Sequence, residues 1–345
     1  MKSRHKLNII LLLVVSLISC ENGEQDFDDF DYTSVYFPFQ YPVRTLVLGD
    51  YVYDNTNDNA GKFIISARMG GVYENKENIR VGYRVAEDII KNIYFPNGTE
   101  IKALPSDYYT LTGESGNSRE TYITPNNFTG KIEVQLTDAF FNDSLAISNN
   151  YVIPLQITET SADSLLVGKS ELTDPNRFIS ADWAFTPKDF TLFAVKYVNP
   201  YHGVYLHSGV ATTYDDSGQV IDTVFSTAEF VEQRELWNIN TFDLTSINTT
   251  NPVKQKGTSP GNYTMKMEFD NAGNIEITTG KGSAFDVIGT GEYVKDGGAW
   301  GGKPRDAMFL KYDIKVGAET VKVIDTLLFR NKDVTFESFI PTVTD

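Results

Sequence analysis

A tryptophan in a glycine-rich segment near the C-terminus is the residue best suited to contact a ligand. Trp300 stands in the sequence Tyr293-Val294-Lys295-Asp296-Gly297-Gly298-Ala299-Trp300-Gly301-Gly302-Lys303-Pro304-Arg305-Asp306. The surrounding glycines predict an exposed loop, and loops on a rigid scaffold commonly carry binding groups. A pyranose ring stacks its apolar C–H face on an aromatic ring, while its hydroxyls pair with polar side chains. The segment therefore predicts a carbohydrate site in which Trp300 stacks on a sugar, with polar contacts from Tyr293, Asp296, Lys303, Arg305 and Asp306.

Two further tryptophans are ranked below Trp300 as ligand contacts. Trp237 is flanked by polar residues and is the second candidate for stacking on a sugar. Trp183 lies near the joint between the two halves of the chain and is predicted to pack there. For Trp300 the alternative stays open that its ring folds back over the end of a β-barrel.

The sequence predicts no catalytic residues, no metal and no cofactor. A glycosidase needs two carboxylates about 5 to 9 Å apart, but 46 acidic residues make chance pairs unavoidable. His202 and His207 are five residues apart on a predicted strand, which places them on opposite faces and disfavours a zinc site or a catalytic triad. The segment from Asp54 to Gly61 offers oxygen ligands for calcium, but Ile65 stands where an EF-hand needs glutamate, so a solvated hairpin loop is predicted.

The first twenty residues predict an exported protein. Lys2, Arg4 and Lys6 precede an apolar run over 7–18, which is typical of a secretory signal and too short to span a bilayer as a folded helix. Cys20 follows this run and is the only cysteine in the chain, so no disulfide framework is possible.

Charge excludes some classes of partner. The chain carries a formal net charge of −16, whereas nucleic acids and anionic lipids require clustered lysine and arginine. Neutral glycans, peptides and partner proteins stay open.

Short alternating strands separated by glycine, proline, asparagine and aspartate predict an all-β chain. We expect a signal peptide over 1–19, an acidic tether over 20–32, a β-sandwich over 33–160, a linker over 161–182 and a second β domain over 183–345. In the first β domain, the run from Lys131 to Leu136 should bury Ile132, Val134 and Leu136. Pro154 favours a sheet edge or a bulge.

The second β domain reads as successive antiparallel hairpins. Turns are predicted at 215–218, 270–274 and 317–319, between the runs 202–213 and 219–225, 262–269 and 275–279, and 309–316 and 320–329. Such hairpins close into an up-and-down barrel, which we favour, or stack as a jelly roll.

Two resemblances give these predictions a family context. Leu17-Ile18-Ser19-Cys20 resembles the lipobox of bacterial lipoproteins, and the acidic run behind it is similar to the surface-export signal of Bacteroidetes lipoproteins. This resemblance implies lipidation of Cys20 and an outer-membrane location facing the cell exterior. The alternative is a cleaved signal with an unmodified cysteine.

The β domains resemble those of Bacteroidetes glycan-utilisation lipoproteins. The segments 104–111, 123–125, 130–134 and 150–157 are similar to an N-terminal immunoglobulin-like domain found beside family-18 glycosidase-like domains, whose catalytic signature is missing from this sequence. The segments 199–205 and 325–330 are similar to a lipocalin-like barrel. The resemblance implies a surface glycan-binding lipoprotein that delivers oligosaccharide to an outer-membrane transporter. A glycoside hydrolase with an unrecognised carboxylate pair and a structural or adhesin-like subunit are the alternatives.

Overall fold

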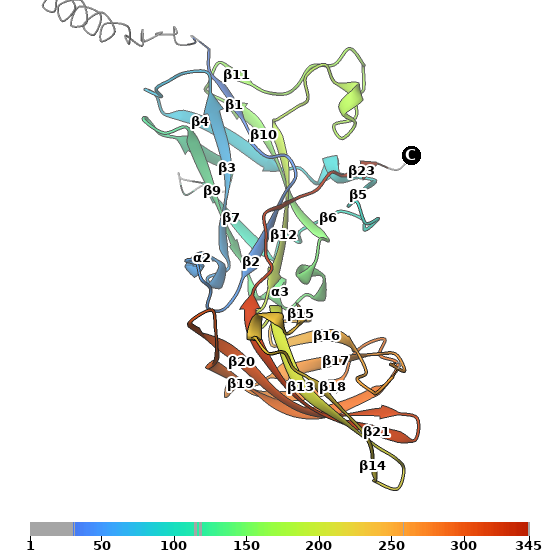
Figure 1. The fold of residues 1–345 in the computed structure, drawn as a ribbon. Coiled ribbons are helices and arrows are strands. Elements are labelled where there is room, and N and C mark those ends of the chain that lie inside the picture. Colours follow the sequence, from blue (N-terminus) through green and yellow to red (C-terminus); the bar gives the residue numbers. More distant parts are fainter. Residues whose placement is uncertain (1–29, 31, 114–115, 117–118, 258, 344–345) are drawn as a thin grey trace, which may run out of the picture.

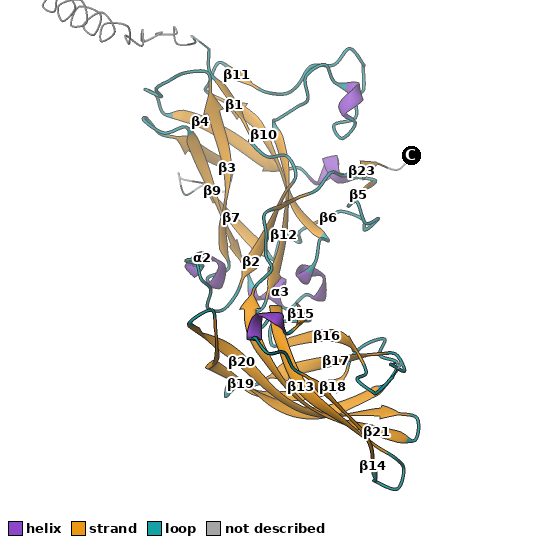
Figure 2. Ribbon diagram, in the orientation of Figure 1, coloured by secondary structure: helices purple, strands orange, loops and turns teal. Residues whose placement is uncertain are grey.

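The chain folds into two β domains in series, as Figure 1 shows. The computed structural model describes residues 30, 32–113, 116, 119–257 and 259–343. Strands make up most of the fold and the helices are single turns (Figure 2). The predicted all-β class is therefore confirmed. The predicted signal 1–19, Cys20 and most of the tether 20–32 lie outside the described residues.

The N-terminal domain is a β-sandwich built from two sheets. The first sheet has the strand order β11 (Ser164–Leu165), β1 (Ser34–Tyr36), β3 (Lys62–Gly70), β9 (Thr129–Leu136) and β7 (Tyr109–Gly113). The second has the order β22 (Glu337–Ser338), β2 (Pro42–Val47), β12 (Phe190–Val198), β10 (Tyr151–Thr160), β4 (Ile79–Val85) and β8 (Glu120–Ile123), with β6 (Lys102–Ala103) also paired to β10.

Alternation along the strands produces the core between these sheets. In β9, Ile132, Val134 and Leu136 are buried as predicted. In β3, Phe63 and Ile65 point the same way, while the residues between them face outward. Every second residue of a strand lies on one face, so two such faces bury a continuous apolar layer.

The proline in β10 is not at a sheet edge, which corrects the prediction. β10 lies between β12 and β4, and Pro154 stands opposite Leu192. The Pro154 oxygen accepts from the Ala86 amide at 2.7 Å, and the Leu192 amide donates to the Gln40 oxygen. Pro154 and Leu192 therefore form a pair that exchanges no ladder hydrogen bonds. The missing amide of the proline costs no hydrogen bond to β12.

Short elements cover the outer face of the second sheet. A third apolar cluster joins Phe190 and Leu192 of β12 to Phe95, Ile101 and Phe339. The small elements of this domain are β5 (Ile93–Tyr94), which pairs with β23 (Thr342–Val343), and the turns α2 (Thr56–Asn59), η1 (Glu87–Ile90), α3 (Asp138–Phe141), η2 (Ser144–Ile147) and η3 (Ser180–Asp182).

The C-terminal domain is a closed eight-stranded antiparallel barrel, which confirms the favoured prediction. Its ring runs β13 (Gly203–Tyr214), β15 (Glu235–Thr241), β16 (Ser246–Pro252), β17 (Asn262–Phe269), β18 (Asn274–Thr279), β19 (Asp286–Trp300), β20 (Lys303–Val316) and β21 (Glu319–Asn331), and it closes by pairing of β21 with β13. An additional strand, β14 (Val220–Ser226), pairs with β13, and η4 (Val231–Gln233) precedes β15.

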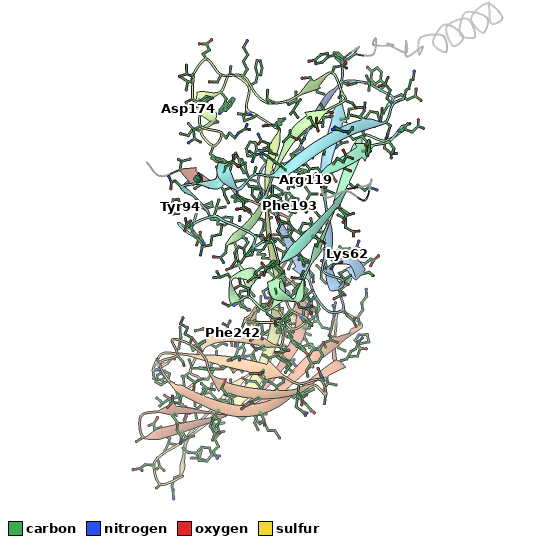
Figure 3. The ribbon with its side chains drawn as sticks, turned by 180° about the vertical axis from the view of Figure 1, so that it is seen from behind. Lys62, Tyr94, Arg119, Asp174, Phe193 and Phe242 are labelled. Atoms are coloured by element: carbon green, nitrogen blue, oxygen red, sulfur yellow. The ribbon has the colours of Figure 1, made fainter. Side chains whose placement is uncertain are left out.

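The domain boundary differs from the predicted one. β12 was expected within the second domain, 183–345, but it pairs with β10 and β2 of the sandwich. The barrel begins only after Asn199, whose side-chain amide donates to the oxygens of Asp243 and Ser246 at 2.8 Å each. Figure 3 labels Phe242 close to this joint.

The end of the chain also returns to the sandwich. Beyond β21, a segment that we call the C-terminal strap (332–343) adds β22 to β2 and β23 to β5. Alternation of apolar and polar residues identifies a strand but not the domain in which it pairs. The sequence therefore could not assign β12 or the C-terminal strap to a sheet.

Candidate ligand-binding groove

A cavity of about 600 Å³ opens along β2 on the sandwich domain. We call it the β2 groove. It lies where β2 leaves its edge uncovered, because β22 pairs only with Pro42 and Val43. Its walls come from β2, the segment 50–58, β12 and residues 334–336 of the C-terminal strap. The volume falls in the range of small-molecule sites.

Aromatic rings surround the groove. The side chains of Phe39, Tyr53 and Phe336 are 60%, 73% and 75% exposed. The rings of Phe39 and Phe336 lie 6.1 Å apart, and Tyr51 meets Tyr53 edge to face at 5.7 Å. Large apolar side chains that stay exposed around a concavity mark a binding surface more often than scattered ones do.

The inner wall of the groove is a further aromatic surface. Phe193 of β12 lines it, and its ring stacks on Phe63 of β3 with centroids 5.4 Å apart. Figure 3 labels Phe193 within the sandwich domain. This contact joins the two sheets behind the groove.

An ion pair between buried Asp58 and partly exposed Arg44 lies at the polar end of the groove. Asp58 of α2 is 5% exposed and accepts hydrogen bonds from the Val47 amide, at 2.9 Å, and from the Arg44 guanidinium. Asn55 donates to the Val47 oxygen at 2.7 Å. These contacts cap the free edge of β2, and they leave the Arg44 side chain 40% exposed toward the groove.

The segment that carries the tyrosines is shaped by local hydrogen bonds. Asp54 accepts from both the amide and the hydroxyl of Thr56, and these bonds, the hydroxyl bond first, lower the pKa of the Asp54 carboxyl. The aspartate and asparagine run at 54–61 was predicted to be a solvated loop. This was wrong for Asp58, because α2 turns its carboxylate inward to meet Arg44.

Two hydroxyls at the groove have no partner in the described part of the chain. The Oγ1 atoms of Thr45 and Thr191 are buried and make no hydrogen bond there, and both residues line the groove. A buried unpaired hydroxyl is costly, so it favours a polar partner.

The charged lining residues are Arg44, Asp54 and Asp58. Their formal charges sum to −1, which favours neutral ligands over anions.

The tryptophan predicted to stack on sugar lies in a strand, not in a loop. Trp300 ends β19 and stands opposite Lys303 across a two-residue turn of Gly301 and Gly302. Both glycines have positive φ, 62° and 74°, as a type I′ hairpin turn requires. The ring packs against Leu206 and Leu328 on the outer wall of the barrel, with the Arg305 guanidinium 5.1 Å from the ring centre.

Strand alternation divides the other predicted contacts between the two faces of this hairpin. Arg305 faces outward with Trp300, whereas Asp306 accepts from the Tyr293 hydroxyl at 2.5 Å and from the Asp296 amide at 3.0 Å. The Tyr293 ring packs on the barrel core. Burial and the Asp306 carboxylate raise the pKa of Tyr293. Lys303 is exposed at the hairpin turn. The structure therefore does not bring the predicted set together on one surface.

Trp237 is buried inside the barrel, so the prediction that it stacks on sugar at the surface was wrong. It is 2% exposed, and its ring lies parallel to the His207 imidazole with centroids 4.1 Å apart. Its polar neighbours in sequence alternate to the outside, while Trp237 and Ile239 point inward. Trp183 is partly buried and donates to the Asn176 oxygen at 2.8 Å, so it packs within the segment before β12 and not at the joint with the barrel.

Sequence reasoning did not find the β2 groove. Phe39, Tyr51 and Tyr53 stand in short segments that show no strand alternation, and Phe336 comes from the opposite end of the chain. Several tyrosines and phenylalanines in short segments beside predicted turns were the available signal.

Among the residues that the structure describes, no group of three or more histidine, cysteine, aspartate and glutamate side chains could hold a metal ion. No helix in the described ranges is long and apolar enough to cross a membrane.

The fold and the groove define a two-domain all-β protein in which a β-sandwich precedes a closed antiparallel barrel. A family model for a domain of unknown function (DUF5627) matches residues 200–333, and a model described as an N-terminal domain matches residues 30–164. A crystal structure of a Bacteroides ovatus protein of unknown function is 35% identical and covers 91% of this chain and 100% of its own, with a TM-score of 0.84. The chain belongs to the same family as that protein.

A more distant structure is a multidomain protein including DUF1735 from Bacteroides ovatus. It is 14% identical, covers 88% of this chain and 97% of its own, and has a TM-score of 0.45. No curated protein matches the chain.

Proposed function

We propose that the protein binds a neutral oligosaccharide in the β2 groove, and that it does so as a lipid-anchored glycan-binding protein of the outer-membrane surface. The observation that carries the proposal is the ring of exposed aromatic side chains, Phe39, Tyr53 and Phe336, around a cavity that also holds Arg44. Aromatic faces and a few directed polar groups are the two features that sugar recognition requires.

The role of each side chain follows from its place in the groove. Phe336 and Tyr53 offer their rings to the C–H faces of sugar residues, and Arg44 donates to hydroxyls while Asp58 holds its guanidinium. The proposal assigns no bond cleavage and no cofactor.

The lipoprotein signal predicted at the N-terminus supports the same proposal. The segment 1–20 has the pattern of a lipoprotein signal with Cys20 as the lipidated residue. A surface anchor allows weak single sites to retain a polymer, because many copies bind one chain and the effective concentration rises. Capture beside an outer-membrane glycan transporter would then deliver oligosaccharide to it.

Affinity electrophoresis of the chain from residue 21 onward tests the proposal. The protein is run through gels containing neutral plant or host glycans and through gels containing acidic glycans. Phe336→Ala and Trp300→Ala are run beside the wild type. Retardation by a neutral glycan that disappears in Phe336→Ala and persists in Trp300→Ala supports the groove.

The other outcomes separate the alternatives. Loss of retardation in Trp300→Ala alone would place the sugar on the barrel hairpin. Released sugar would make the protein a glycoside hydrolase. Unretarded migration on every glycan would reject carbohydrate binding in favour of a protein-contact role.

A further inference from the structure

The barrel wall has one seam that is almost without backbone pairing. β15 and β16 are joined by only two register pairs, Asn240 with Asn248 and Thr241 with Ile247. β16 and β17, in contrast, pair along their whole length from Ser246 to Pro252. Residues 235–239 of β15 make no register pair with β16. The next strand along the chain from β13, β14, pairs only with β13 among the described strands and does not close the seam.

Side chains bridge the seam where the backbone does not. The Thr249 hydroxyl donates to the Asn238 oxygen at 3.0 Å, and the Lys254 ammonium contacts both carboxylate oxygens of Glu235 at 2.9 and 3.0 Å. The Lys256 amide donates to Asp222 of β14. Partly exposed contacts of this kind contribute far less than a strand ladder does, so this seam is the weakest line in the wall.

A polar chain runs inward from the seam. His207 Nδ1 lies 3.3 Å from Glu235 Oε2, although without the alignment of a hydrogen bond, and His207 Nε2 lies 2.9 Å from Asp325 Oδ1. The Tyr312 hydroxyl donates to Asp325 Oδ2 at 2.6 Å and also contacts the Tyr263 hydroxyl at 2.6 Å. His207 and Asp325 are 2% and 3% exposed, so a line of contacts joins surface Lys254 to the barrel interior.

The interior behind the seam is built to hold these polar groups. Gly209 stands where an added Cβ would lie 1.9 Å from Asp325 Oδ1, so a glycine is needed for the carboxylate to enter the core. Two buried polar atoms here, His207 Nδ1 and Trp237 Nε1, have no hydrogen-bond partner within the described residues. A small cavity lined by His207, Trp237 and Asp325 lies here and reaches Lys254 and Ser226 on either side of the seam.

We propose that the barrel opens along the seam between β15 and β16 and admits a small neutral polar molecule to this interior. The Lys254–Glu235–His207 contacts hold the seam shut. The unpartnered atoms of His207 and Trp237 supply hydrogen bonds to the entering molecule. This compartment is distinct from the β2 groove and does not depend on carbohydrate binding there.

Acrylamide quenching of Trp237 fluorescence tests the proposal directly, because acrylamide is itself a small neutral polar molecule. Trp183→Phe and Trp300→Phe together leave Trp237 as the sole tryptophan. In this background Glu235→Gln removes the negative charge that pairs with Lys254 and lies beside His207. Glu268→Gln removes the charge of the Lys266–Glu268 pair on β17, away from the seam, and serves as the matched control.

We expect Glu235→Gln to raise the quenching constant of Trp237 by about threefold or more at an unchanged melting temperature, because a local opening becomes more frequent. The control should leave the constant unchanged. An equal quenching constant with and without Glu235→Gln, both measured in the protein with Trp237 as its sole tryptophan, would overturn the proposed opening of the seam.

Hydrogen exchange of the unmodified protein provides a second test that needs no substitution. Amides of 235–239 and 250–257 should exchange faster than those of β17 and β18. Uniform protection around the barrel would overturn the proposal even if the tryptophan variants failed to fold.

Discussion

The ring of Phe336 lies 6.1 Å from the ring of Phe39, although the two residues come from opposite ends of the chain. Phe39 precedes β2, while Phe336 belongs to the C-terminal strap that leaves the barrel after β21. The Glu337 carboxylate pairs with Lys196 of β12 at 2.9 Å and holds the strap on the sandwich. The β2 groove is therefore assembled on the sandwich domain from the two ends of the chain.

Removal of the Phe336 ring should weaken glycan binding without weakening the fold. The side chain is largely exposed, so Phe336→Ala costs little core packing, whereas loss of one stacking platform is worth about 1 kcal/mol, or roughly fivefold to tenfold in affinity. Titration calorimetry with the glycan that retards the wild type measures the loss. Phe225→Ala, which removes an equally exposed ring from β14 on the barrel, is the control. Equal losses in both variants would contradict a specific role for Phe336.

Asp58 should matter for stability as well as for binding. Asp58→Ala leaves the Val47 amide without its acceptor and Arg44 without its partner. Arg44 stays partly solvated, so the main cost is the unpaired Val47 amide, which is about 2 kcal/mol. Urea unfolding should therefore show a lower midpoint. Asp54→Ala, which loses contacts at the exposed end of the same segment, should change the midpoint much less. Similar midpoints for the two variants would mean that Asp58 does not anchor β2.

Much of the fold follows from local pattern, and the exceptions have physical reasons. Alternation located β9 and the hairpins of the barrel, because a strand that buries one face must alternate. The segment from Tyr293 to Asp306, which spans the end of β19 and the start of β20, was read as a loop because of its glycines. In the sheet the glycines of β19 allow close approach: an added Cβ at Gly298 would lie 2.5 Å from Leu328, and at Gly289 it would lie 2.3 Å from the Lys311 oxygen. The β2 groove could not be predicted, since it depends on the strap returning from the barrel.

His202 should make the protein less stable in mild acid. Burial, reinforced by the nearby Lys332 ammonium, lowers the pKa of His202 from 6.5 to about 4. Between these values the unfolded chain binds the proton more tightly, so stability falls as the pH drops from 6.5 towards 4, by up to about 3 kcal/mol. The ring nitrogen Nδ1 accepts from the Thr241 amide at 3.2 Å, and Asn could replace that acceptor. Denaturant unfolding from pH 7 to pH 4 should show a steeper loss for the wild type than for His202→Asn. Parallel curves would contradict the assignment.

Lys332 should produce a dependence of the same sign in the alkaline range. Its ammonium is buried at the domain joint and donates to the backbone oxygens of Asn199 and Pro200, beside the Phe329 ring. Burial lowers the pKa of Lys332 from 10.5 to about 8, despite the opposing effect of the Asp306 carboxylate. Between pH 8 and pH 10.5 the unfolded chain holds the proton that the folded chain has released. The stability of the wild type relative to Lys332→Met should therefore rise with pH, by about 1.4 kcal/mol per pH unit at most.

The difference in unfolding free energy between the wild type and Lys332→Met isolates the effect of Lys332, since tyrosines and other lysines titrate in both proteins. Urea unfolding at pH 7.5, 8.5 and 9.5 measures the difference in free energy. A difference that stays constant across this range would show that the Lys332 amine is solvated, and that the joint between the domains is looser than the buried contacts of Lys332 with Asn199 and Pro200 require.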